Sequence, residues 1–321
     1  MHLHCIFLSK CYLNYLSSFW GALHSNKLIT VNKLIDSYRN NKSLNNKIIG
    51  IKLSSRGDLL KLNFPIDLDN ESYFKLYALM ISEGSIRTEF SLNVPESEFH
   101  KIFDECIKRL ISKEIIIKKD FNNNFERSRA PAVIRYLIPI KDHLPYNLFS
   151  NREFAREYLK IVFEAEGCPI FNLTKSKKYI KLSRNNDVSN LFNKETSLPE
   201  QKRVFIKKIK ENYKKQYDQL IKNPPPLILG EYLLLKHCFD VDSSLRLENI
   251  CLNKIGNRKG KITSQWVIYI YSGEDLKKFN NQIGFISNSK IHKCNEMIEK
   301  IPSHNKQYTA LNMHEWANNN N

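Results

Sequence analysis

The segment Leu76-Tyr-Ala-Leu-Met-Ile-Ser-Glu83-Gly84 is an apolar run that ends in a glutamate and a glycine. A second run, Leu159-Lys-Ile-Val-Phe-Glu-Ala-Glu166-Gly167, ends in the same pair 83 residues later. Each run has helical character and precedes a strand-like segment, at 85–94 and at 168–174. Two matched helix–strand segments in one chain predict two structural repeats.

The residues around these runs predict one order of elements twice: helix, hairpin, helix, hairpin. Asp69 or Asn70 can cap a first helix over 71–83, and Asn151 begins the helix that ends at Glu166. Alternation of apolar and polar residues from 85 to 94 predicts one half-buried strand, and the polar segment 122–129 predicts a hairpin tip. Further helices are predicted over 95–112, 230–238, 274–283 and 289–301, and further strands over 115–119, 132–140, 169–174, 179–184, 245–253 and 262–271.

This order predicts an α+β fold made of two repeats. Residues 1–60 are expected to be an N-terminal extension of unclear role, 61–150 the first repeat and 151–301 the second. The second repeat is expected to hold a Lys-rich helical insertion near 187–226, and 302–321 a disordered tail.

The charge of the chain indicates a polyanionic partner. Among its 321 residues, 50 Lys and Arg face 33 Asp and Glu, which gives a formal net charge of +17. Such an excess favours nucleic acid as the partner, although a proteome rich in Lys and Asn would produce a similar excess.

The cysteines and the N-terminal segment bear on the compartment. The seven cysteines form no C-x-x-C pair, which favours reduced thiols in the cytosol over a disulfide or zinc framework. Lys10 and Asn14 interrupt the apolar stretch 5–23, so its uninterrupted length is too short to span a membrane. We expect a protein of the cytoplasm, or of an organellar matrix if it is organelle-encoded, that is not secreted and has no membrane contact.

The two glutamates are candidate metal ligands. A glycine after a helix is typical of a left-handed cap, but a carboxylate in the last turn opposes the helix dipole at about 0.3–1 kcal/mol. Ala78, Ser82 and Ala165 are small residues that would let the two helices approach closely, which would bring Glu83 and Glu166 together. Two neighbouring carboxylates suit Mg²⁺, which can activate water for phosphodiester hydrolysis.

Basic side chains along the predicted hairpins are candidate DNA ligands. They are expected to alternate outward, where a sheet could follow a major groove, although an ordinary solvated face has the same composition. These residues are Arg87, Lys175, Lys178, Arg184 and Arg246.

On these residues the chain resembles the single-chain LAGLIDADG homing endonucleases. The resemblance covers about 62–301 and includes both motif copies, the closing segment Ile270-Tyr-Ser-Gly-Glu-Asp-Leu-Lys-Lys-Phe279, Ile283-Gly-Phe285 and Lys290. It implies two pseudo-symmetric αββαββα halves whose curved antiparallel sheets form a DNA-binding saddle. It also implies a monomeric, Mg²⁺-dependent enzyme that cuts both strands of duplex DNA in intron homing.

The same resemblance implies roles for three residues. Glu83 and Glu166 would be the metal-binding catalytic acids, and Lys290 would help to activate water or to stabilise the transition state. The chain departs from the family pattern at Lys160 and Ile161 of the second motif and in its longer segment 187–226.

Two other functions share this scaffold. An intron RNA maturase needs the same basic groove, and so does a catalytically inactive DNA-binding regulator. An intein is disfavoured, because Lys306 after His304-Asn305 offers no nucleophile and no splicing domain flanks the repeats.

Overall fold

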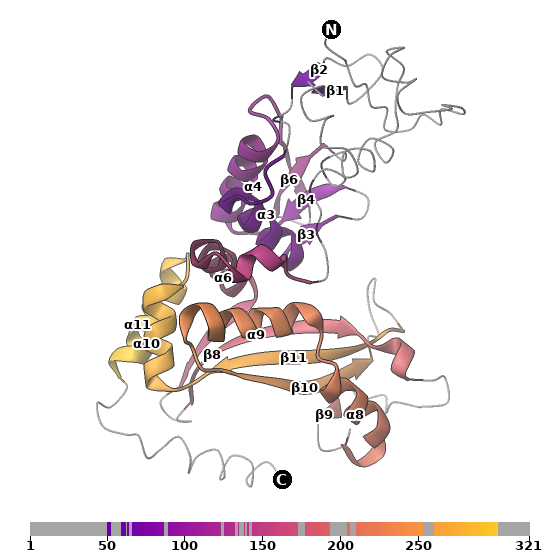
Figure 1. The fold of residues 1–321 in the computed structure, drawn as a ribbon, viewed down its shortest axis with the longest axis vertical. Helices are drawn as coiled ribbons and strands as arrows, with labels where there is room; N and C mark the ends of the chain where they lie inside the picture. Colours follow the sequence, from indigo (N-terminus) through magenta and orange to yellow (C-terminus); the bar gives the residue numbers. More distant parts are fainter. Residues whose placement is uncertain are drawn as a thin grey trace. The chain divides into compact units, whose positions relative to one another are not determined.

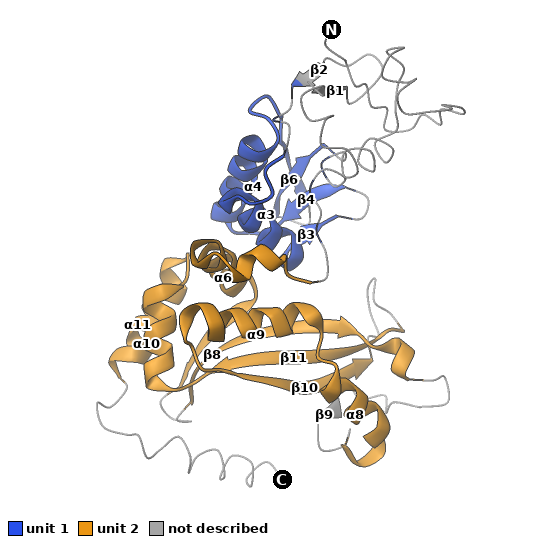
Figure 2. Cartoon of the chain, viewed as in Figure 1, with its two compact units in different colours: residues 1–141 blue, residues 142–321 orange. Residues whose placement is uncertain are grey.

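The computed structural model describes residues 50–52, 59–61, 63, 66–86, 89–122, 125–131, 134, 138, 140, 143–172, 177–192, 204–205, 210–252 and 260–300. The chain divides into two compact units, unit 1 at residues 1–141 and unit 2 at 142–321 (Figure 2). Each unit has its own sheet and its own helices.

Unit 1 runs helix, two strands, helix, two strands. Its elements are α3 (Glu71–Ser82), β3 (Gly84–Ser85), β4 (Phe90–Asn93), α4 (Ser97–Leu110), β5 (Lys118–Asn122) and β6 (Phe125–Ala130). The four strands form an antiparallel sheet in the order β3-β4-β6-β5. Two further strands, β1 (Gly50–Lys52) and β2 (Leu59–Lys61), pair with each other.

One face of the unit 1 sheet packs on α3 and α4. Phe90 and Leu92 of β4 are fully buried, and the ring of Phe90 lies 6.0 Å from that of Phe103 on α4. His100 of α4 contacts Ser128 Oγ of β6 at 2.8 Å and Val94 O at 2.9 Å. The buried imidazole therefore ties the second helix to the sheet within an otherwise apolar layer.

Unit 2 repeats this order with additions. It contains η2 (Tyr146–Phe149), α6 (Arg152–Glu166), β7 (Gly167–Asn172), β8 (Lys177–Asp187), η3 (Ser189–Leu191), β9 (Val204–Phe205), α8 (Lys214–Lys222), α9 (Pro226–Phe239), β10 (Ser244–Leu252), β11 (Ile262–Ile270), α10 (Gly273–Gln282) and α11 (Asn288–Glu299). Its sheet has the order β7-β8-β11-β10-β9, and α9 lies along it (Figure 1).

The two faces of the unit 2 sheet differ in character. On the helix-covered face, Ile180 and Leu182 of β8 stand beside Ile268 and Ile270 of β11, and all four are fully buried. The ladder between β10 and β11 shifts between Leu247 and Asn249, so Glu248 is an extra residue in β10. This β-bulge reverses the alternation: Leu247 faces the helices before it, and Asn249 pairs with Gln265 on the opposite face after it.

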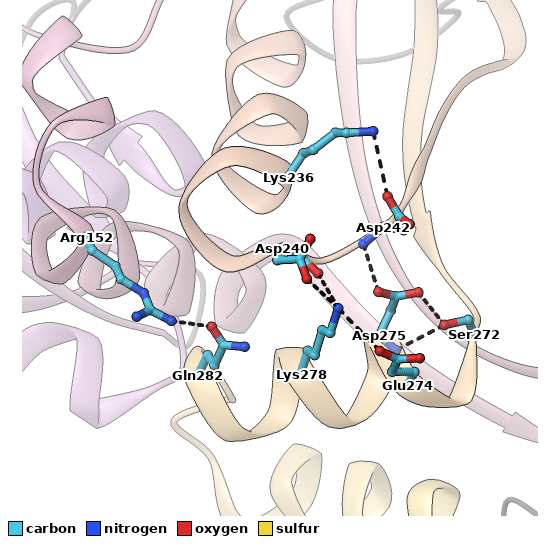
Figure 3. A network of polar contacts seen from close by, with 9 residues as sticks. All are labelled: Arg152, Lys236, Asp240, Asp242, Ser272, Glu274, Asp275, Lys278 and Gln282. Atoms are coloured by element: carbon cyan, nitrogen blue, oxygen red, sulfur yellow. Dashed lines mark hydrogen bonds and ion pairs between the residues drawn. The ribbon is translucent and has the colours of Figure 1, made fainter.

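A polar network fixes the corner where β11 passes into α10 (Figure 3). Ser272 caps α10 by accepting a hydrogen bond from the Asp275 backbone N–H at 3.0 Å. The buried Asp275 carboxylate accepts the Asp242 N–H at 2.8 Å, which joins α10 to the start of β10. Lys278 binds the Asp240 carboxylate at 2.6 Å, at the left-handed residue that ends α9.

The predicted α+β class is confirmed, as are both helix starts. Asn70 Oδ1 accepts the Ser72 N–H at 2.8 Å, and Asn151 Oδ1 accepts the Glu153 N–H at 3.0 Å. None of the described helices combines the length and the apolar character needed to cross a membrane. The predicted extension 1–60 is described only at 50–52 and 59–60, and the predicted tail lies outside the described residues.

Three element predictions are wrong. The alternation over 85–94 does not form one strand, because Gly84–Ser85 turns back to pair with Ser91–Leu92. The predicted tip 122–129 is largely strand β6, and the strand predicted over 115–119 is displaced toward the N-terminus from β5; the predicted strand 132–140 is described only at 134, 138 and 140. The Lys-rich segment near 187–226 includes β9 and the end of β8 besides helix α8, because Val204–Phe205 extends the sheet by pairing with β10.

Candidate functional site

Both motif glycines are required by a close approach of strand to helix. A Cβ on Gly84 would lie 2.6 Å from Met80 Cα and 2.7 Å from Met80 O, and a Cβ on Gly167 would lie 2.9 Å from Phe163 Cα. In each unit the obstacle is the residue four positions earlier in the motif helix. The expected left-handed cap is wrong for Gly167, which is extended at φ −85° and ψ 149°.

The two glutamates occupy equivalent corners of the two units. Glu83 is the C-cap of α3 and Glu166 the last residue of α6, and each precedes a glycine that opens a strand. Gly84 pairs with Leu92, and Gly167 pairs with Leu182 in the same way. Glu83 is exposed and the Glu166 side chain is 33% exposed, so both carboxylates lie outside the cores. Because they belong to different units, their approach to each other stays a prediction.

Glu166 joins a buried polar chain inside unit 2. Arg184 Nη1 donates to Glu166 Oε1 at 3.3 Å, and Arg184 Nη2 donates to Glu231 Oε1 at 2.7 Å. Glu231 is fully buried on α9 and also accepts the hydroxyl of Tyr158 at 2.9 Å. We call Tyr158, Arg184 and Glu231 the buried triad.

The charge state of Arg184 follows from this environment. Burial alone would lower the pKa of Arg184, but the charge of Glu231 and its hydrogen bonds outweigh burial and raise that pKa above the ordinary value. The guanidinium therefore stays charged beside Glu166. This corrects the predicted outward position of Arg184, which is 8% exposed and lies on the helix-covered face of the sheet.

Lys290 and Glu164 clasp α6 to α11. The Lys290 ammonium donates to Glu164 O and, at 2.9 Å, to Gly167 O, so it satisfies backbone carbonyls at the motif corner. In return the Glu164 carboxylate accepts the backbone N–H groups of Ile286 at 2.7 Å and Ser287 at 3.1 Å, where α11 begins. The structure thus places the Lys290 ammonium beside the backbone of Glu164 and Gly167, two residues before and one residue after Glu166. Its catalytic role stays a prediction.

The residues at this corner fit a hard divalent cation held by few protein ligands. Within the described residues, no three His, Cys, Asp or Glu side chains gather in a way that could hold a metal ion. Mg²⁺ commonly binds through one or two carboxylates and takes its remaining ligands from water and substrate phosphate. Glu166, partly exposed and oriented by Arg184, suits that mode, and Glu83 is the equivalent residue of unit 1.

The face of the unit 2 sheet opposite the helices is polar and aromatic. Lys181 binds Glu248 at 2.8 Å, and the same carboxylate accepts the Tyr269 hydroxyl at 2.8 Å. Arg246 donates to the Tyr271 hydroxyl at 2.9 Å. Asn249 donates to Gln265 at 2.6 Å, and Gln265 pairs with Asn185 in the ladder. Amide, hydroxyl and cationic groups of this kind can contact both base edges and phosphates.

The corresponding face of the unit 1 sheet carries two arginines from the predicted hairpin tip 122–129. Arg127 binds Asp120 through Nε at 2.8 Å and Nη2 at 3.2 Å, and Arg129 also contacts Asp120. Arg127 Nη1 lies 3.6 Å from Glu89. The pairs Asp120–Arg127 and Lys118–Arg129 across β5 and β6 show that these side chains share one face. The spacing of two between Arg127 and Arg129, which is typical of one face of a strand, is the sequence signal for this position.

The other predicted DNA ligands divide by position. Arg87 and Lys175 lie outside the described residues, and Arg246 lies on the face opposite the helices. Lys178 lies two residues before Ile180 and four before Leu182, so it shares their helix-side face, and it donates to Lys300 O at 2.8 Å. This corrects its predicted outward position, because β8 begins at Lys177 and Lys178 therefore lies within the strand, not in the predicted tip 175–178.

The chain is similar to several solved structures, while no family model and no curated protein matches it. Full-length DUF199/WhiA from Thermatoga maritima is 12% identical, with 80% of this chain and 70% of that chain covered, at a TM-score of 0.40. The N-terminal LAGLIDADG domain of DUF199/WhiA is 13% identical, covering 71% and 89%, at 0.35. I-DmoI in complex with DNA and Mn is 15% identical, covering 67% and 98%, at 0.35. These are distant likenesses, and none assigns a function to this chain.

Proposed function

We propose that the chain is a sequence-specific, Mg²⁺-dependent endonuclease of double-stranded DNA. The observation that supports this most is the repeated corner: in each unit a motif helix ends at a glutamate outside the core, and the next glycine opens a strand in the same register. A carboxylate at the C-terminal end of a helix opposes the helix dipole, so ending the helix does not account for a glutamate at this position in both units. Cleavage of two strands requires two such carboxylates.

In this proposal Glu83 and Glu166 are the carboxylates, one from each motif helix, that hold Mg²⁺. When bound by these carboxylates, Mg²⁺ would supply an activated water and stabilisation of the leaving oxygen of the phosphodiester. Arg184 holds the Glu166 carboxylate in place, and Lys290 fixes the backbone on either side of it. The polar faces of the two sheets, with Arg127 and Arg129 in unit 1 and Lys181 and Arg246 in unit 2, contact the duplex.

A second function is supported by the contact between Arg184 and Glu166. A guanidinium 3.3 Å from the carboxylate neutralises part of the charge that a cation needs. A protein that binds duplex DNA as a regulator and does not cut it would tolerate this pairing. We rank it second, because Glu231 already balances the charge of Arg184.

The deciding experiment is cleavage of a randomised duplex-DNA library by the full chain with Mg²⁺. Glu83→Gln and Glu166→Gln remove one carboxylate charge each and should abolish cutting while duplex binding persists. The matched controls are Glu71→Gln and Glu153→Gln, which change a first-turn glutamate of the same two helices and should cut normally. EDTA should stop cutting by every variant.

Each other outcome selects a different function. Tight, salt-sensitive duplex binding by the wild type without cuts would establish the regulator. Cutting that survives both Gln substitutions would show that the carboxylates are not the catalytic acids. Absence of duplex binding together with binding of intron RNA would favour the maturase.

A further inference from the structure

The ion pair between Arg184 and Glu231 is buried in a place where the fold does not need one. Glu231 is 0% exposed and the Arg184 side chain 9% exposed. Removing two charges from water is expensive, and buried ion pairs are often no more stabilising than apolar residues of similar volume. Stability alone therefore does not account for this pair.

Unit 1 shows that an apolar residue serves at the equivalent position. Gly84 pairs with Leu92 and Gly167 with Leu182, so the residue two places further along is Val94 in unit 1 and Arg184 in unit 2. Val94 is 3% exposed. The same corner is thus built with a valine in one unit and with a charged triad in the other.

One contact of Arg184 points outside the core. Its Nε and Nη2 face Glu231, and its Nη1 reaches the partly exposed Glu166. Because the charge of Glu231 balances that of the Arg184 guanidinium, Arg184, Glu231 and Glu166 together carry the net charge of one carboxylate. Arg184 can therefore hold Glu166 by hydrogen bonding without cancelling its charge.

We propose that the buried triad of Tyr158, Arg184 and Glu231 is a positioning device that fixes the Glu166 carboxylate for cation binding in unit 2. Arg184 and Glu231 are positioning residues in this scheme, since Glu231 acts only through Arg184. The cation part rests on the proposed function; the fixing of Glu166 does not.

The test replaces the whole triad by apolar residues in the full chain. The variant Tyr158→Phe/Arg184→Met/Glu231→Leu removes both partners of each hydrogen bond within the triad, so its thermal midpoint should stay close to that of the wild type. Glu166→Gln should then lower the midpoint in the wild-type background and leave it unchanged in the triad variant. A shift that is equal in both backgrounds would overturn the proposal, whether or not a cation binds.

Cation affinity gives the second readout, with Mn²⁺ as the probe in calorimetric titration. Freeing a glutamate side chain that was held before should weaken binding about tenfold in the triad variant. Glu231→Gln leaves Arg184 uncompensated beside Glu166 and should weaken binding further, an order that a merely structural triad would not produce. Lys278→Met breaks an ion pair on α10 far along the chain from Glu166 and should leave Mn²⁺ affinity unchanged.

The two proposals can fail separately. If the wild type binds no Mn²⁺ and the midpoints are non-additive, the metal function fails and the positioning of Glu166 stands. If Mn²⁺ binds equally well to the wild type and to the triad variant, the role of the triad in cation binding is refuted while the proposed function remains.

Discussion

Gly167→Ala tests the close approach of strand β7 to helix α6. The new Cβ would lie 2.9 Å from Phe163 Cα and Cδ1 and closer still to Phe163 O, and the first and last of these are backbone atoms. Relief therefore requires the helix end or the strand to move, which also disturbs the Lys290 bond to Gly167 O. Overpacking costs about 1–3 kcal/mol and a lost hydrogen bond about 1 kcal/mol, so we expect a loss of about 3 kcal/mol.

The assay is thermal unfolding, with Gly230→Ala as the matched control. For a unit of this size about 3 kcal/mol corresponds to a fall of about 6–12 °C in the midpoint. In the control the nearest atoms are Cδ1 and Cγ of Leu144, at 2.8 and 2.9 Å, in a side chain that can rotate away. Because alanine also favours helix over glycine by about 1 kcal/mol, Gly230→Ala in α9 should be nearly neutral. Equal midpoints for the two variants would refute the reasoning.

Three further predictions follow from contacts within single units. Glu164→Ala removes the acceptor of two N–H groups where α11 begins, so it should lower the free energy of unfolding, measured in urea, by about 2–3 kcal/mol. The control Glu153→Ala, on the exposed first turn of α6, should change this free energy little. Equal losses in the two variants would contradict the clasp of α6 to α11. The hydrogen bond from Arg127 lowers the pKa of Asp120, so the folded state holds this proton less tightly than the unfolded state. The wild type should therefore have a higher free energy of unfolding than Asp120→Asn above about pH 4, and this difference should vanish as the pH falls through the lowered pKa. A difference that grows as the pH falls would contradict the lowered pKa of Asp120. Arg246→Gln should reduce the slope of log binding constant against log salt concentration for duplex DNA by about one phosphate contact. Lys178→Gln makes the same charge change on the helix-side face and should leave this slope unchanged. Equal slopes for the two variants would contradict the assignment of faces.

Much of the fold could be predicted because its decisive features are local. The Asn70 and Asn151 caps, the apolar faces of the motif helices and the hairpin of β7 and β8 each depend on residues close in sequence. Hairpin registers in unit 1 could not be predicted in the same way. The alternation from 85 to 94 is compatible with a single strand, and only pairing with β6 makes Phe90 the start of the inner strand.

The candidate site shows the same limit. Repetition of Glu-Gly identified Glu83 and Glu166, and the glycine contacts explain why a glycine follows each glutamate. The buried triad could not be found from the sequence, because Tyr158, Arg184 and Glu231 come from three elements and each is unremarkable where it stands. Arg184 is expected to point outward only because it is charged, whereas its spacing of two from Leu182 and four from Ile180 already places it on the helix-side face of β8.

The β-bulge at Glu248 gives β10 one residue more than its ladder with β11 requires. Deleting Glu248 would make Leu247 and Asn249 neighbours in an unbroken ladder, and both would keep their present faces, because each already has its own partner in β11. The deletion would remove from the polar face of unit 2 the carboxylate that Lys181 and Tyr269 share. A deletion in a regular strand such as β11 would instead turn every residue beyond it to the other face. A lineage, or an engineer, could thus change the length of β10 at Glu248 with the loss of a single group from the polar face.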